Sequence, residues 1–231
     1  MNFIVDKTMP NFMIDKLRCY GTIYKSTTII TEDEAISTHP DLQIHFVADT
    51  IAFCPPATIE YYEKILPSHI NLHIGTVNPG STYPSVCAYN IARVGEHILC
   101  NTKIADTKIL KYYEENNYKI IHVNQGYTKC NVCPISDSVF LTEDQGIFNS
   151  VKSEPALTAY LLEKGEVSLN GFDYGFIGGA TGKIGNNTLV CCGKLIANKE
   201  KILKLLSALN MQLLELSYGS IYDYGSILSF V

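Results

Sequence analysis

The residues best suited to metal binding or redox chemistry are eight cysteines and six histidines. Cys130 and Cys133 have the spacing of a zinc or disulfide-exchange pair, but no second pair and no histidine at zinc-finger spacing accompany them. Positions i and i+3 of a strand point to opposite faces, so this segment predicts buried thiols. Most other cysteines lie in apolar runs, and no secretion signal is evident, which predicts reduced core thiols.

His69 and His73 have the i, i+4 spacing that can chelate a metal on a helix. The apolar residues Ile70, Leu72 and Ile74 alternate with polar ones here, which indicates a strand. Four strand residues span roughly 13 Å, too far for one ion. The sequence therefore predicts no metal site and no cofactor.

The glycine-rich string Gly178–Lys183 is superficially similar to a phosphate-binding loop, because glycine lets backbone N–H groups approach an anion. Ile177 and Ile184 stand where such a loop requires glycine and serine or threonine. Close packing of strands near a central axis explains these glycines better.

Composition excludes several classes of partner. The 231 residues include 18 basic and 23 acidic ones and carry a net charge of −5, with no basic stretch suited to nucleic acid. No apolar run approaches the roughly 20 residues of a membrane-spanning helix. We expect a single cytoplasmic domain over residues 1–231, without nucleic-acid or membrane contacts, and the sequence leaves its oligomeric state open.

A strand–strand–helix–strand pattern recurs four times along the chain. The paired strands are expected at Leu42–Cys54, Val86–Cys100, Thr128–Leu141 and Phe172–Cys192. Such a unit cannot bury its own faces alone, so the copies must pack around a shared axis.

The two chain ends suggest a fifth, split copy. Tyr20–Tyr24 echoes Tyr218–Tyr222, and both ends contribute strand-like sequence. Five units closing around an axis would leave no exposed sheet edge. The sequence therefore predicts an α/β fold, a five-bladed pseudo-symmetric propeller of ββαβ repeats.

Two short strings resemble the guanidine-modifying enzyme superfamily, whose pentein fold is a five-bladed α/β-propeller. Phe46–Thr50 is similar to the superfamily's Phe-Val-x-Asp-[Thr/Pro] string, which implies that Asp49 binds a substrate guanidinium. Asp223–Ser229 resembles the terminal glycine-rich strand that carries the nucleophile.

The residues of the superfamily's reaction are missing at the expected positions. The nucleophilic cysteine should fall at about Ser229 and the proton-shuttling histidine near Ile177, but no cysteine follows Cys192 and no histidine follows His122. The third blade's acidic Gly-Gly-Asp pattern corresponds to Lys129–Asn131, with an amide in place of the acid. Canonical amidino hydrolysis or transfer is therefore not expected.

Seven residues are expected to converge on one axial cavity because equivalent inner-strand positions of a propeller meet there: Asp49, Lys129, Cys130, Gly178, Gly179, Asp223 and Ser226. The lysines would suit an anionic ligand and the aspartates a cationic one. The leading interpretation is a pentein-fold protein that binds a small polar molecule. The alternatives are an enzyme that uses Cys130, Lys129 and Asp223, and a macromolecular-interaction protein like the ribosome anti-association factor of the same fold.

Overall fold

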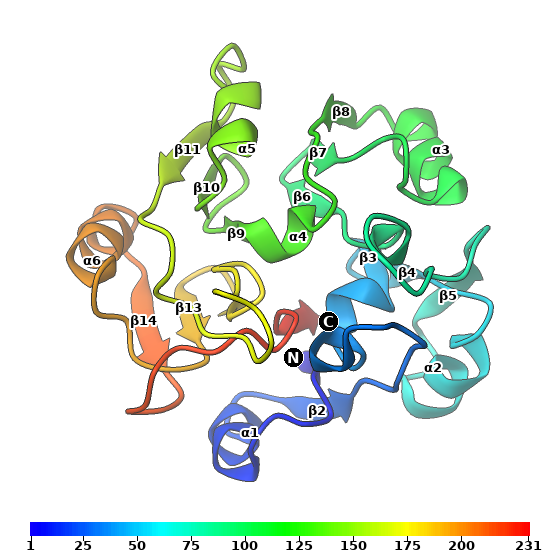
Figure 1. Ribbon diagram of the computed structural model, residues 1–231, viewed down its shortest axis with the longest axis horizontal. Coiled ribbons are helices and arrows are strands. Elements are labelled where there is room, and N and C mark those ends of the chain that lie inside the picture. The colour runs from blue at the N-terminus through cyan, green and yellow to red at the C-terminus, as the bar shows by residue number, and fades with distance from the viewer.

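Five three-stranded sheets surround a central axis in the computed structural model, which describes residues 1–231 (Figure 1). In sequence order the strands are β1 (Asn2–Val5), β2 (Thr22–Lys25), β3 (His45–Ala48), β4 (Ile51–Cys54), β5 (Asn71–Ile74), β6 (Ala92–Val94), β7 (His97–Cys100), β8 (Lys119–His122), β9 (Val132–Pro134), β10 (Val139–Thr142), β11 (Thr158–Leu161), β12 (Thr181–Ile184), β13 (Thr188–Cys191), β14 (Gln212–Glu215) and β15 (Leu228–Phe230). The helices are α1 (Asn11–Arg18), α2 (Ile59–Ile65), α3 (Thr107–Glu115), α4 (Thr128–Asn131), α5 (Gln145–Ser150) and α6 (Lys199–Ala208).

Each sheet repeats one topology. An inner strand pairs antiparallel with a middle strand, which pairs parallel with an outer strand; the sheets are β3–β4–β5, β6–β7–β8, β9–β10–β11, β12–β13–β14 and β15–β1–β2. Parallel neighbours need a crossover, and one helix of each blade supplies it on the outside of the ring (Figure 1). The predicted propeller of ββαβ units is confirmed.

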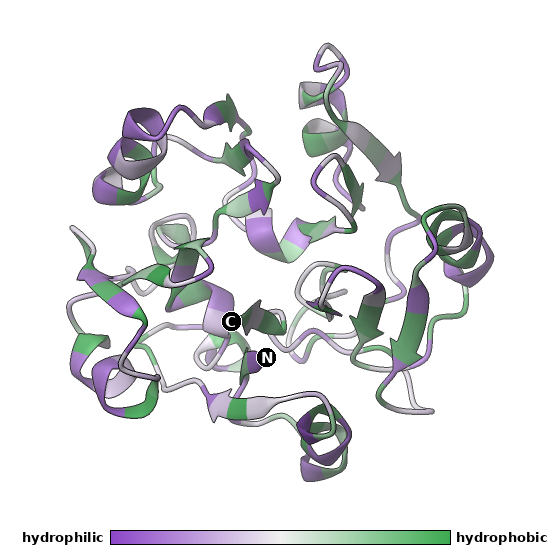
Figure 2. Ribbon diagram, turned by 180° about the vertical axis from the view of Figure 1, so that it is seen from behind, coloured by the Kyte–Doolittle hydropathy of each residue, from purple (hydrophilic) through white to green (hydrophobic).

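The middle strands explain why the sequence repeats. They begin at residues 2, 51, 97, 139 and 188, and in each the first residue is half-buried while the next three are buried. A strand covered on both faces reads as a continuous apolar run, as in Ile51–Cys54. In Figure 2 the strands are mostly hydrophobic, whereas the surrounding helices carry hydrophilic segments.

The fifth blade joins the two chain ends. β15 pairs with β1 in the register Asn2↔Phe230, and β1 pairs with β2 in parallel, so the predicted split blade is confirmed. The echo between Tyr20–Tyr24 and Tyr218–Tyr222 is not a structural equivalence. The first string leads into the outer strand β2, whereas the second follows the outer strand β14.

All four predicted strand segments are shorter than expected at their starts, and the first begins at His45 instead of Leu42. Residues 128–131 form α4 and only 132–134 form a strand, residues 172–180 precede β12 without strand pairing, and β6 begins only at Ala92. The chain must cross from the outer strand of one blade to the axis before each inner strand begins, and turns accomplish this crossing. His69 also lies in a turn, and only His73 of that pair belongs to a strand.

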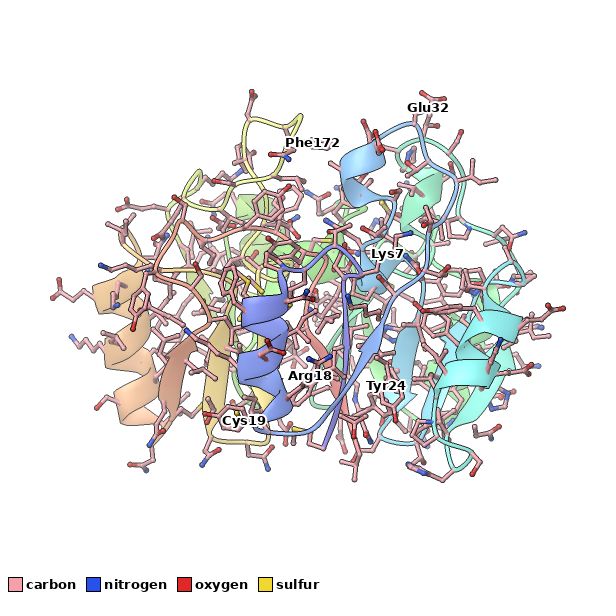
Figure 3. The ribbon with its side chains drawn as sticks, turned by 90° about the horizontal axis from the view of Figure 1, so that it is seen from below. Lys7, Arg18, Cys19, Tyr24, Glu32 and Phe172 are labelled. Carbon is pink, nitrogen blue, oxygen red and sulfur yellow. The ribbon has the colours of Figure 1, made fainter.

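Seven of the eight cysteines are buried and all eight are free thiols; Cys19 is exposed. The connections between blades gather on one face, where Figure 3 places Glu32 and Phe172, while Cys19 and Tyr24 lie toward the opposite face. None of the helices has the length and apolar character needed to cross a lipid bilayer.

Candidate axial binding site

A cavity of about 220 Å³ lies among the inner strands of all five blades. Its walls include apolar side chains such as Ile44, Phe46, Ile91 and Leu228. The volume would hold several waters, since one water occupies about 30 Å³ of liquid. A ligand of this cavity is therefore a small molecule with few non-hydrogen atoms.

Three cationic side chains and one carboxylate line the cavity. Arg93 comes from β6, Lys129 from α4 and Lys183 from β12, whereas Asp41 precedes β3. Arg93 donates from Nε to Gly95 O at 3.1 Å and from Nη1 to Val47 O at 2.8 Å, and its guanidinium lies over the Tyr118 ring at 5.3 Å from the centroid. Nη2 has no hydrogen-bond partner in the protein. Burial lowers the pKa of Lys183, an effect that the nearby Asp137 opposes, and the Lys183 side chain lines the cavity.

His45 adds no positive charge to this wall. Burial, together with the charges of Arg93 and Lys129, lowers its pKa to about 3, so the ring is neutral near neutral pH. His45 Nε2 lies 2.6 Å from the Tyr113 hydroxyl, which fixes the ring. The cavity lining is therefore cationic overall, and an anionic ligand complements it.

A hydrogen-bonded cluster closes one end of the cavity. Ser226 Oγ and Cys130 Sγ lie 2.8 and 3.1 Å from Asp41 Oδ2. Ser226 Oγ is also 2.8 Å from Gly178 O and accepts a hydrogen bond of 2.9 Å from Lys129 Nζ. Lys129 thus offsets the buried Asp41 charge through one intervening hydroxyl.

Asn90 ties this cluster to the second blade. Its Oδ1 accepts from the backbone N–H groups of Lys129 at 2.7 Å and Cys130 at 3.2 Å. Its Nδ2 donates to Asp41 O at 3.3 Å and to Cys130 Sγ at 3.2 Å. Asn90 is 1% exposed, so water cannot replace these bonds.

His39 and Asp223 lie on the other side of the cluster, at a second cavity of about 70 Å³. Aromatic residues including Tyr127, Phe172 and Phe176 cover it, and Phe172 belongs to the loop face seen in Figure 3. Both carboxylate oxygens of Asp223 accept backbone N–H bonds, from Gly225 and Phe176, each at 2.9 Å. Burial is the main cause that raises the Asp223 pKa.

Glu143 is a buried carboxyl group beside this region. It is 2% exposed; Oε2 accepts the Ile177 N–H at 2.8 Å, while Oε1 has no partner. Burial raises its pKa from 4.5 to about 7. The folded protein therefore holds a proton on Glu143 that the unfolded chain releases between these two pH values.

The difference in free energy of unfolding between Glu143→Gln and wild type should shift in favour of the variant as pH increases from about 4.5 to about 7. The wild-type protein loses stability over this window because only the unfolded state ionises Glu143 there. The loss is at most about 3.5 kcal/mol, at roughly 1.4 kcal/mol for each unit by which the pKa is raised. Denaturant unfolding at several pH values measures the difference. The exposed Glu114→Gln is the matched control and should follow wild type; a Glu143 variant parallel to wild type would contradict the raised pKa.

The structure brings together six of the seven residues expected at the axis. Lys129, Cys130 and Ser226 are joined directly to Asp41 or to one another, and Gly178 O accepts from Lys129 Nζ at 3.4 Å. Gly179 O accepts the Ser226 N–H at 2.6 Å and the Tyr224 N–H at 3.2 Å. The Asp223 carboxylate packs against Gly179 so closely that an added Cβ would lie 2.0 Å from Oδ1.

The prediction that Asp49 lies at the axis is wrong. Asp49 and Thr50 form the exposed turn between β3 and β4, where Ala48 pairs with Ile51. A tight hairpin turn favours this residue pair regardless of any ligand. The axial carboxylate from the first repeat is Asp41.

Asp41, Asn90, Arg93 and His39 were missed by sequence reasoning. One positional signal could have found Asn90. Asn90, Cys130, Gly179 and Ser226 each stand two residues before an inner strand, at β6, β9, β12 and β15. Asp41 stands four residues before β3. The residues of the hydrogen-bonded cluster therefore precede the inner strands, whereas the cations Arg93 and Lys183 lie within β6 and β12.

The two positions where the superfamily's nucleophile and histidine were expected, Ser229 and Ile177, differ in their exposure to solvent. Ser229 is exposed on β15 and lines the axial cavity. Ile177 is 2% exposed and contributes its N–H to Glu143. Ser226 is the buried axial hydroxyl of the last strand segment, at a backbone φ of +75°.

Comparisons with known proteins agree with the architecture. Residues 4–228 match the family model described as a family of unknown function (DUF6873). A search of curated proteins gave no significant match.

Several solved structures share the fold at low sequence identity. An amidinotransferase of the saxitoxin pathway from Microseira wollei matches with a TM-score of 0.60 and 11% identity, over 98% of this chain and 93% of its own. A dimethylarginine dimethylaminohydrolase variant from Pseudomonas aeruginosa, bound to citrulline, gives 0.58 and 9% identity over 94% and 91%. The agmatine deiminase of C. jejuni gives 0.54 and 13% over 98% and 80%.

Proposed function

The chain belongs to the family of unknown function DUF6873 and has the pentein fold, and from this premise we propose that it binds a small organic anion in the axial cavity. The observation that carries the proposal is the lining of that cavity, three cations from three blades against one carboxylate. Arg93 Nη2 and the Lys183 ammonium make no hydrogen bond to the protein and supply the donors. Charge-assisted bonds of this kind are the stronger class in proteins.

The volume of the axial cavity and the residues that line it indicate the class of ligand. The cavity of about 220 Å³ is smaller than typical drug-binding pockets of roughly 300–1,000 Å³. Apolar side chains line the cavity together with the cations, so a fitting ligand carries an anionic group on a short apolar skeleton. Small carboxylates and phosphate esters fit this description, and amino acids fit it if Asp41 accepts their ammonium group.

The solved structures of the same fold include an agmatine deiminase, an amidinotransferase and a dimethylarginine dimethylaminohydrolase bound to citrulline, so arginine and agmatine belong in the ligand panel. We do not expect turnover of either. The thiol at the axis is Cys130, and burial together with the Asp41 charge raises its pKa well above the ordinary value, so it is a neutral thiol and a weak nucleophile.

An enzymatic function remains the second candidate because a thiol, an imidazole and a carboxylate lie together. Ligand-type atoms of Cys130, His39 and Asp41 are within 4.8 Å of one another. Release of ammonia, citrulline or ornithine from arginine, methylarginines or agmatine, lost in Cys130→Ser or Ser229→Ala, would favour this candidate over binding alone.

Thermal-shift screening of small carboxylates, phosphate esters and amino acids, followed by calorimetric titration of the best ligand, tests the proposal. In the double variant Arg93→Met/Lys183→Met, affinity should fall by roughly 100-fold or more, since each of the two lost charge-assisted bonds is worth about 1.5–3 kcal/mol. Lys64→Met, which removes an exposed cation from α2, should leave affinity unchanged. A ligand that binds both variants equally well would place anion recognition outside the cavity.

A further inference from the structure

Three buried side chains with metal-binding atoms meet at the partition between the two cavities. His39 and Asp41 come from the connection between β2 and β3, and Cys130 comes from α4. Their ligand atoms all lie within 4.8 Å of one another, and the residues are 1–3% exposed. We propose that His39, Asp41 and Cys130 together bind one divalent transition-metal ion of the zinc class.

The donor set suits this ion. Zinc is bound in proteins by thiolate, imidazole and carboxylate groups, often by three of them with a fourth position left for water. A thiolate and a carboxylate also neutralise the two positive charges of the ion, so the occupied site carries no net charge in the protein interior. Hard ions such as magnesium prefer all-oxygen sites and do not match a thiol and an imidazole.

A second observation points to the same place. Asp41 Oδ2 already contacts Cys130 and Ser226, but Asp41 Oδ1 is buried without any hydrogen-bond partner. An unpaired buried carboxylate oxygen costs free energy unless a cation or donor reaches it. Metal coordination by Asp41 would satisfy it.

The surroundings hold the imidazole in place. Gly225 has a φ of +63°, and a Cβ there would lie 2.3 Å from His39 Cβ, so glycine allows the last strand segment to pass against the ring. Asp41 N–H donates to Gly225 O at 3.2 Å, which links the same segment to the second ligand. Asp223 Oδ1 lies 3.9 Å from His39 Nδ1, beyond hydrogen-bond distance but on the side of the ring where an outer carboxylate commonly orients a metal-bound histidine.

The site has room for a fourth ligand, and the proton that Cys130 loses on metal binding can leave to solvent. His39 and Cys130 line the cavity of about 70 Å³, which is large enough for a water as the fourth ligand. Binding replaces the thiol proton, now directed toward Asp41, by a metal–sulfur bond and releases that proton to solvent. The Asn90 amide, 3.2 Å from Cys130 Sγ, can donate to the resulting thiolate.

Titration of the chelator-treated full-length protein with cobalt(II), followed by competition with zinc(II), tests the site without any knowledge of an organic ligand. We expect one equivalent of cobalt to produce a thiolate-to-cobalt charge-transfer band that zinc abolishes. Cys130→Ser should eliminate the band and weaken zinc binding by more than roughly 100-fold. His39→Gln should weaken zinc binding while it retains the band at high cobalt concentration.

Cys133→Ser is the matched control, because Cys133 is an equally buried thiol three residues further along the chain. It should retain the band and the affinity, and circular dichroism verifies that each variant is folded. Absence of stoichiometric cobalt and zinc binding by the wild-type protein overturns the proposal, whatever the variants do. A band that survives in Cys130→Ser, or that is lost in folded Cys133→Ser, overturns it as well. Failure of anion binding leaves this result unaffected, since the probe is the metal alone.

Discussion

Replacement of Asn90 by leucine should lower the free energy of unfolding by about 3–5 kcal/mol, although the two side chains are similar in size. The variant leaves the buried N–H groups of Lys129 and Cys130 without their acceptor. Each unsatisfied buried donor costs about 1–3 kcal/mol, and the donors to Asp41 and Cys130 are lost in addition. Urea unfolding followed by circular dichroism measures the change.

Asn101→Leu provides the comparison. Asn101 also accepts a backbone N–H, from Lys103 at 3.2 Å, and donates to Asn124 O at 3.0 Å, but these bonds are exposed to solvent. Water can replace them, so we expect a loss below about 1 kcal/mol. Equal losses in the two variants would mean that Asn90 is not the buried tie between the second and third blades.

Phe230→Ala should also destabilise the protein by about 3–5 kcal/mol, the usual cost of deleting a buried aromatic side chain. Phe230 is 3% exposed, stacks on Phe46 with ring centroids 4.8 Å apart and contacts Tyr24 at 5.9 Å. These partners belong to the first and fifth blades, so the cavity left by the substitution would lie where the two ends of the chain close the ring.

Tyr218→Ala removes another aromatic side chain near the C-terminus, but Tyr218 is 94% exposed and its loss should be close to neutral. Thermal and denaturant unfolding of both variants separate the two cases. A Phe230 variant as stable as the Tyr218 variant would show that β15 does not contribute to closure of the propeller.

The propeller could be predicted because its repeated signal is local. Each middle strand is a short run buried on both faces, followed by an amphipathic helix with its own capping residue in two cases, Asp106 and Asp144. Such patterns can be recognised in a sequence because each depends only on the residues of one strand and the helix that follows it. The blade that the two chain ends share could also be predicted, because closing the ring of blades leaves no exposed sheet edge.

The site was predicted only in part because it depends on where the connections between blades enter the axis. Cys130 and Ser226 were found from polar strings, but the Asp49 string matched the superfamily motif in a hairpin turn, while Asp41 occupies the axis. The same uncertainty led to the prediction of a strand through Thr128–Cys133, where a helical turn places Cys130 and Lys129. Tertiary crossings of this kind leave no periodic pattern in a sequence.

A crystal of the protein soaked in a small bromine-labelled carboxylate tests the central claim most directly, because anomalous scattering locates the bromine without bias. We expect a peak inside the axial cavity, with the carboxylate within hydrogen-bond distance of Arg93 Nη2 and Lys183 Nζ. The same soak of Arg93→Met/Lys183→Met crystals should show no peak there. An empty cavity in the wild-type crystal, or an equal peak in both crystals, would contradict the assignment of this cavity as an anion-binding site.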